Sequence, residues 1–208
     1  MEKHQLSTSA DVLKVGSTVP NFTAAYNGAA YALTAITVTT ARPDVALSWI
    51  EDQHLFLDLH PMNGLSLNGL SQAMTLTGGQ TDSVRLTIAG NDGTGLVKTA
   101  DKITVEFVHG SHVVATANYT VIVVGDTNLD GVIQAGDAIV MMNIYNGVTY
   151  STDGEARLLA ADAARNGIVQ AGDATRIMTK WFLLAESGDP EEAWAKWLEM
   201  VDEIHENQ

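Results

Sequence analysis

The chain is short of cysteine, of basic residues and of long apolar runs. It contains no cysteine, which excludes disulfides and thiolate metal sites. Its 208 residues include 11 Lys and Arg against 25 Asp and Glu, for a formal net charge of -14. That balance argues against nucleic acid as a partner, because neutralising phosphates requires clustered basic side chains. No run approaches the roughly 20 apolar residues of a membrane helix, so we expect no membrane insertion.

Targeting and catalytic motifs are missing as well. The first residues, MEKHQLSTSADVLKV, have no apolar core of signal-peptide length. We therefore expect the chain as written to be cytosolic, or to be a fragment of a longer secreted protein. It has no serine-elbow motif, glycine-rich phosphate loop or zinc motif, so we expect no enzyme activity. Four histidines flank expected strands or turns, where surface residues are commoner than ligands: His54, His60, His109 and His112.

Residues 11–124 have the pattern of β-structure. Threonine and branched side chains dominate Tyr31–Thr40, and residues of Asp82–Gly90 alternate between apolar and polar. Further short runs of this kind are His54–His60, Lys102–Val108 and His112–Val124. His109–Ser111 predicts a hairpin turn between the last two. Several short strands at this spacing predict an Ig-like β-sandwich.

From Gly125 the pattern changes to loops followed by helices. Apolar periodicity predicts helices over Ala135–Gly147, Thr152–Ala163 and Ala171–Glu186. Residues 187–208 predict an amphipathic C-terminal helix whose apolar stripe we expect to pack on this protein: Trp194, Trp197, Leu198, Val201 and Ile204. No spacer separates the β half from the helical half, so we expect a rigid junction and domains at 1–124, 125–186 and 187–208.

Two segments of the helical half repeat one another. DTNLDGVIQAGDA begins at Asp126 and DAARNGIVQAGDA at Asp162, an offset of 36 residues (162 − 126). Each fits a calcium loop, which supplies oxygens at positions 1, 3, 5, 7, 9 and 12 and turns at a glycine in position 6. The first loop offers Asp126, Asn128, Asp130, the Val132 carbonyl, Gln134 and Asp137. The second offers Asp162, Asn166, the Ile168 carbonyl, Gln170 and Asp173.

We expect Ca²⁺ in both loops, more weakly in the second. Position 3 of the second loop is Ala164, which has no side-chain oxygen, so water would replace that ligand. An Asx-turn that caps each following helix is the alternative, and the repeated QAGDA disfavours it. Calcium should supply folding free energy to the small helical half, so chelation should unfold that half and abolish docking.

The repeat resembles a dockerin, a family with two calcium-loop–helix repeats about this far apart. Asp rather than Glu at position 12 and no helix before each loop are shared traits over Gly125–Ala185. QAGDA is similar to dockerins of ruminococcal type. The resemblance implies an all-α module that binds a cohesin and so assembles or anchors a cellulosome, an extracellular complex that degrades plant polysaccharides. The fused β half resembles the X-module of X-module–dockerin pairs in scaffoldins or adhesion proteins. This implies a secreted, cell-surface-associated fragment of a larger protein.

Dockerins recognise partners through loop positions 10 and 11 and the exposed face of the next helix. In this sequence these positions are Ala135, Gly136 and Asn143, then Ala171, Gly172 and Thr179. The two helices share an apolar stripe that predicts core: Ala138 and Ala174, Met141 and Ile177, Met142 and Met178, Tyr145 and Trp181. The first helix adds Ile139, Val140 and Ile144, where the second has Thr175, Arg176 and Lys180. Either a partner, bound in one orientation, or this chain's own tail covers these three residues.

Two other functions fit parts of the pattern. The β half could be a carbohydrate-binding module beside an enzyme-borne dockerin, although its aromatic residues are few and Trp49 has a core-like context. Met141, Met142 and Met178 could form the groove of a calcium sensor, but the missing flanking helices argue against it. A sensor would stay folded without calcium, whereas a dockerin half should lose most of its helical circular dichroism in chelator.

Overall fold

The computed structural model describes residues 18–26, 29–40, 48–51, 53–58, 64–77, 83–109, 111–187, 192–193 and 195–196. The strands in these ranges are β1 (Thr18–Tyr26), β2 (Ala29–Thr40), β3 (Ser48–Glu51), β4 (His54–Leu57), β5 (Met74–Thr77), β6 (Ser83–Ile88), β7 (Lys102–His109) and β8 (His112–Val123). The helices are α1 (Leu67–Ala73), α2 (Ala135–Tyr145), α3 (Gly154–Ala161) and α4 (Ala171–Ser187). None of the helices in this part of the chain has the length and apolar character needed to cross a bilayer.

The strands form two sheets, one of them mixed. Three strands pair antiparallel in the order β1-β2-β5, and five pair in the order β3-β4-β8-β7-β6. Within the larger sheet, β4 runs parallel to β8, with Leu55 opposite Val121. The other pairs of that sheet are antiparallel and include the predicted β7–β8 hairpin. A mixed sheet is not the antiparallel arrangement of an Ig-like sandwich.

The predicted fold class, an Ig-like β-sandwich followed by an all-α dockerin, is therefore wrong. Besides the parallel β4–β8 pair, the helical half is not isolated from the sheet, because α3 packs on β8. One core cluster includes side chains from the sheet, from the loops and from α2, α3 and α4. Alternation within a segment predicts a strand, but it carries no information about which strand will pair with it or in which direction.

Single elements agree with the sequence pattern. In β6, Leu86 and Ile88 are buried while Arg85 and Thr87 are exposed, as alternation predicts. Arg85 Nε also donates to Glu106 Oε2 on β7 at 2.6 Å. The three predicted helices are confirmed, with ends within two residues of the expected ones for α2, α3 and α4. The predicted C-terminal helix and its tryptophan stripe lie outside the described residues, apart from the helical pairs 192–193 and 195–196.

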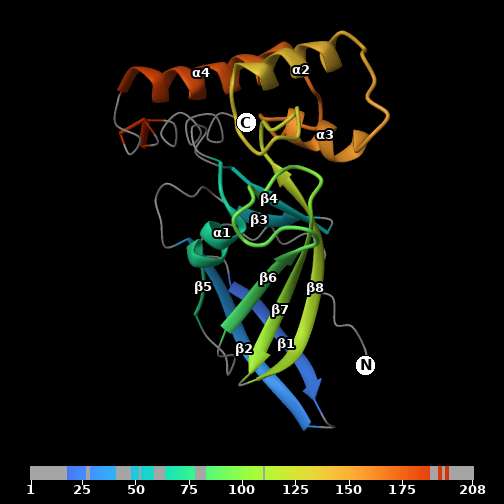
Figure 1. The fold of residues 1–208 in the computed structure, drawn as a ribbon, viewed down its shortest axis with the longest axis vertical. Coiled ribbons are helices and arrows are strands. Elements are labelled where there is room, and N and C mark those ends of the chain that lie inside the picture. The colour runs from blue at the N-terminus through green and yellow to red at the C-terminus, as the bar shows by residue number, and fades with distance from the viewer. Residues whose placement is uncertain are drawn as a thin grey trace.

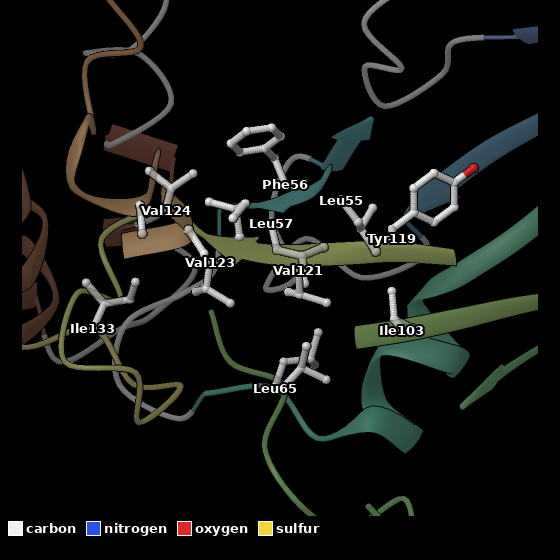
Figure 2. Close-up of a cluster of buried hydrophobic side chains, with 14 of the residues drawn as sticks. Leu55, Phe56, Leu57, Leu65, Ile103, Tyr119, Val121, Val123, Val124 and Ile133 are labelled. Atoms are coloured by element: carbon white, nitrogen blue, oxygen red, sulfur yellow. The ribbon is translucent and has the colours of Figure 1, made fainter. Parts of the chain in front are cut away.

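The end of β8 connects the sheet to the helices. α2 and α4 pack side by side at one end of the molecule, and α3 lies next to the end of β8 (Figure 1). Val121 and Val123 of β8 are fully buried in the core, and Ile133 at position 8 of the first loop lies at the helical end of the same cluster (Figure 2). Ile133 is 1% exposed, as expected of a residue that anchors its loop to the core.

Candidate metal centre

Loop 1 is Asp126–Asp137 and loop 2 is Asp162–Asp173. Loop 1 follows β8 and ends in the first turn of α2, and loop 2 follows α3 and ends in the first turn of α4. The expectation that no helix precedes either loop is therefore wrong for loop 2, because α3 ends one residue before Asp162. The predicted short helix and the start of loop 2 are contiguous.

Both loops have the same backbone conformation at the same positions. Position 6 is glycine in each, and Gly131 and Gly167 both have φ 83°. Position 4 is also left-handed, with φ 69° at Leu129 and 57° at Arg165. A left-handed backbone costs a side-chain-bearing residue of the order of 1 to 2 kcal/mol. Two such residues at corresponding places indicate that the same turn is imposed in both copies.

Side-chain oxygens hold both turns through backbone N–H groups. At position 1, Asp126 Oδ1 and Asp162 Oδ1 each accept from the position 5 N–H at 3.0 Å. At position 5, Asp130 Oδ1 and Asn166 Oδ1 accept from the position 7 N–H at 2.8 and 3.1 Å. The two loops therefore share this network, although one carries an aspartate and the other an asparagine at position 5.

The position 12 carboxylates close the loops. Asp137 accepts from the N–H groups of positions 3 and 9 at 3.1 and 3.0 Å, and Asp173 does so at 2.8 and 2.7 Å. Asp137 Oδ1 also accepts from the Thr127 N–H at 2.9 Å. These bonds span the loop from its second and third residues to its end, which brings position 1 and position 12 together.

Two of the three carboxylates of loop 1, Asp126 and Asp137, are buried, and Asp130 is exposed. Asp126 and Asp137 are both 0% exposed. Burial raises the pKa of Asp137 to about 6, and the charge of Asp126 adds to this effect. Burial also raises the pKa of Asp126, as does the charge of Asp130. The charge of Asp130 thus disfavours ionisation of Asp126, and that of Asp126 disfavours ionisation of Asp137. A divalent cation would relieve that repulsion.

The donor set of loop 1 fits calcium in its chemistry. All its predicted ligands are oxygens, which calcium prefers. The side chains of positions 3, 5 and 9 meet, because Asp130 Oδ2 accepts from Asn128 Nδ2 at 2.7 Å and from Gln134 Nε2 at 3.4 Å. A carboxylate has about four lone-pair sites, so the backbone hydrogen bonds of Asp126 and Asp137 leave acceptor capacity for a cation.

Acidic side chains alone do not form a metal cluster. In the ranges that the structure describes, no three His, Cys, Asp or Glu side chains are arranged to hold a metal ion. In loop 1 the third carboxylate, Asp130, is directed to the two amide side chains. In loop 2, position 5 is Asn166, which leaves the two carboxylates Asp162 and Asp173. The proposed ligand sets therefore depend on amide and carbonyl oxygens as well.

The predicted partner residues differ in exposure. Ile139 is 65% exposed, Asn143 is exposed and Val140 is half-buried, but Ile144 packs against the core. At positions 10 and 11, Ala135 and Gly136 are half-buried, and Ala171 and Gly172 are exposed; Thr179 is half-buried. In the shared stripe, four residues are buried and two methionines pack against the core: Ala138, Met141, Ala174, Ile177, Met142 and Met178. Tyr145, which the stripe places in the core, is 53% exposed.

The sequence did not reveal three contacts that join segments far apart in the chain. Arg157 of α3 is buried and donates to the Thr127 carbonyl at position 2 of loop 1. The Arg165 guanidinium, at position 4 of loop 2, lies 3.8 Å from the centre of the Phe56 ring. Lys180 of α4 pairs with Asp58, 122 residues earlier in the chain. No local pattern signals such partners, because each depends on how distant segments pack.

Comparison of the chain with protein-family models, with curated proteins and with solved structures finds no match. Inferences about function therefore depend on the residues, their spacing and their geometry.

The two position 6 glycines provide a matched test of how loop 1 packs. Both have φ 83°, but a Cβ at Gly131 would lie 2.9 Å from the Val97 carbonyl oxygen, while a Cβ at Gly167 would meet nothing within 4 Å. Gly131→Ala should therefore lower the free energy of unfolding by at least about 1 kcal/mol more than Gly167→Ala, because only Gly131 adds overpacking to backbone strain. Urea denaturation of both variants measures the difference, and equal losses would contradict this packing.

Proposed function

We propose that loops 1 and 2 bind calcium and that α2 and α4 dock onto a cohesin-like partner protein. The observation that carries this proposal is the hydrogen-bond network that the loops share, from position 1 to position 12, with two left-handed residues at corresponding places. An Asx-turn that merely caps a helix does not require the same network across a whole loop in two copies.

Calcium would be held by the oxygens of each loop. In loop 1 these are the side chains of Asp126, Asn128, Asp130, Gln134 and Asp137 and the Val132 carbonyl. Loop 2 lacks a side-chain oxygen at position 3 and one carboxylate at position 5, so its affinity should be lower. When bound, the cation supplies two positive charges that compensate the buried carboxylates. The residues themselves set the loop shape through their backbone hydrogen bonds.

Exposed apolar side chains on both α2 and α4 support a docking role. Ile139 and Tyr145 of α2 and Phe182 of α4 are 65, 53 and 49% exposed. Exposed large apolar side chains are available for contact with a partner protein. The corresponding residue to Ile139 on α4 is Thr175, whose hydroxyl donates to the Ala171 carbonyl at 3.1 Å. The two helices therefore offer different surfaces, and binding should favour one orientation.

Docking should require calcium and the exposed face of α2. In titration calorimetry against a panel of cohesins, we expect binding with calcium and none in excess chelator. Ile139→Asp should weaken that binding at least about tenfold, roughly 1.4 kcal/mol. Leu158→Asp is the matched control, since Leu158 is 50% exposed on α3 rather than on α2.

The two parts of the proposal fail in different ways. If calcium binds but no cohesin in a broad panel does, the docking function is wrong while the calcium sites stand. If no heat of calcium binding appears, both are wrong. Equal loss from Ile139→Asp and Leu158→Asp would show that binding does not use α2.

A further inference from the structure

The segment between β6 and β7 lies directly against loop 1. The N–H of Thr99, between β6 and β7, donates to Asp126 Oδ2 at 2.8 Å. Thr99 is 1% exposed and Asp126 is 0% exposed, so this bond is shielded from solvent. Gly131, at position 6, also approaches the carbonyl of Val97, as its lack of space for a Cβ shows. Residues outside the repeat therefore pack directly against loop 1.

Thr99 is itself held in place by the last residues of β8. Its Oγ1 donates to the Val123 carbonyl and accepts from the Val123 N–H, both at 3.1 Å. The Ala100 N–H donates to the Val121 carbonyl at 2.9 Å, and the Val121 N–H donates to the Asp101 carbonyl at 2.8 Å. Because β8 leads directly into loop 1, these hydrogen bonds fix the position of the Thr99 N–H relative to the start of the loop.

Loop 2 shows how the same position is held within a repeat. There Asp162 Oδ2 accepts from the position 6 N–H of its own loop at 2.7 Å. Asp126 Oδ2 accepts from a residue 27 positions away, outside its own repeat. A hydrogen bond to a ligating carboxylate fixes the orientation of that ligand, and loss of such a bond commonly weakens metal affinity.

We propose that Thr99 is a positioning residue for the calcium ligand Asp126, so that calcium binding in loop 1 orders the Val97–Asp101 segment. This inference rests on the proposed calcium function. Coupling between two sites is reciprocal in free energy. If the Thr99 N–H favours the calcium-binding orientation of Asp126, calcium bound by Asp126 must stabilise the Thr99 contact to the same extent. The sheet side would then respond to calcium as well as the helical half.

Amide hydrogen exchange of the unmodified protein tests the coupling. Addition of saturating calcium should slow exchange in peptides covering 97–101 at least about fivefold, together with residues 126–137. Peptides covering 111–117, where β8 starts at the far end of the sheet (Figure 1), should be unchanged. Protection of 126–137 without any at 97–101 would overturn the inference and leave the calcium proposal standing. No protection in either segment would overturn both.

Substitution of Thr99 separates positioning from stability. Thr99→Val removes the hydrogen bonds of the hydroxyl to Val123 and should lower the affinity of the tighter calcium site by about 3- to 10-fold. Thr99→Ser keeps the hydroxyl and should keep the original calcium affinity. Thr104→Val is the matched control, because the Thr104 hydroxyl bonds to Asn118 at 2.9 Å on the exposed side of β7 and β8. If Thr99→Val is less stable but binds calcium with unchanged affinity, Thr99 has a structural role only and the inference is wrong.

Discussion

Replacing Asp137 with alanine is expected to remove one of two bound calcium ions and to lower the free energy of unfolding by about 3 to 5 kcal/mol. Its side chain is fully buried and accepts from the N–H groups of Thr127, Asn128 and Gln134. Each donor left unpaired in a buried place costs about 1 to 3 kcal/mol. Calorimetric stoichiometry measures the first effect, and urea denaturation at a fixed calcium concentration measures the second.

Two variants control for the loss at Asp137. Asp173→Ala, at the same position of loop 2, should remove the weaker calcium ion and retain the tighter one. Glu155→Ala changes an exposed carboxylate in the first turn of α3, so its unfolding free energy should stay within about 0.5 kcal/mol of the original. Asp137→Ala protein that still binds two calcium ions would show that loop 1 is not a calcium site.

Replacing Lys180 with methionine should destabilise the protein by about 3 kcal/mol. Lys180 is 1% exposed and pairs with Asp58, whose side chain is 12% exposed. Burial lowers the pKa of Lys180, and the charge of Asp58 opposes that shift. Breaking a buried pair by removing one partner costs about 3 to 5 kcal/mol, because the other charge is left uncompensated. Arg176, which also lies within the field of Asp58, should hold the loss to the lower end of that range.

The second lysine pair provides the control for Lys180. Lys196 and Glu192 are paired at 2.6 Å but are 50 and 56% exposed, so Lys196→Met should cost less than about 1 kcal/mol. The double variant Asp58→Asn with Lys180→Met should be more stable than the sum of the single losses predicts. Similar unfolding midpoints for Lys180→Met and Lys196→Met would contradict a buried pair that joins α4 to the sheet side.

Local features of the molecule were predictable because they depend on short sequence separations. The two loops, the glycines at position 6, the inward Ile133 and the helices that follow are determined by residues within about a dozen positions of one another. The same is true of the alternation in β6 and of the β7–β8 hairpin. Tyr145 shows the limit of periodicity: it continues the stripe of α2 but lies at the last residue of that helix and is exposed.

The tertiary structure alone decided how these local units combine. The parallel pairing of β4 with β8, the Lys180–Asp58 pair and the Thr99–Asp126 hydrogen bond all join segments far apart in the chain. Such partners are selected by the shape and charge of whole packed surfaces, and a strand or a buried lysine carries no local mark of its partner. The sequence by itself therefore determined the two loops and the helices after them. Packing determined that the segment between β6 and β7 lies against loop 1.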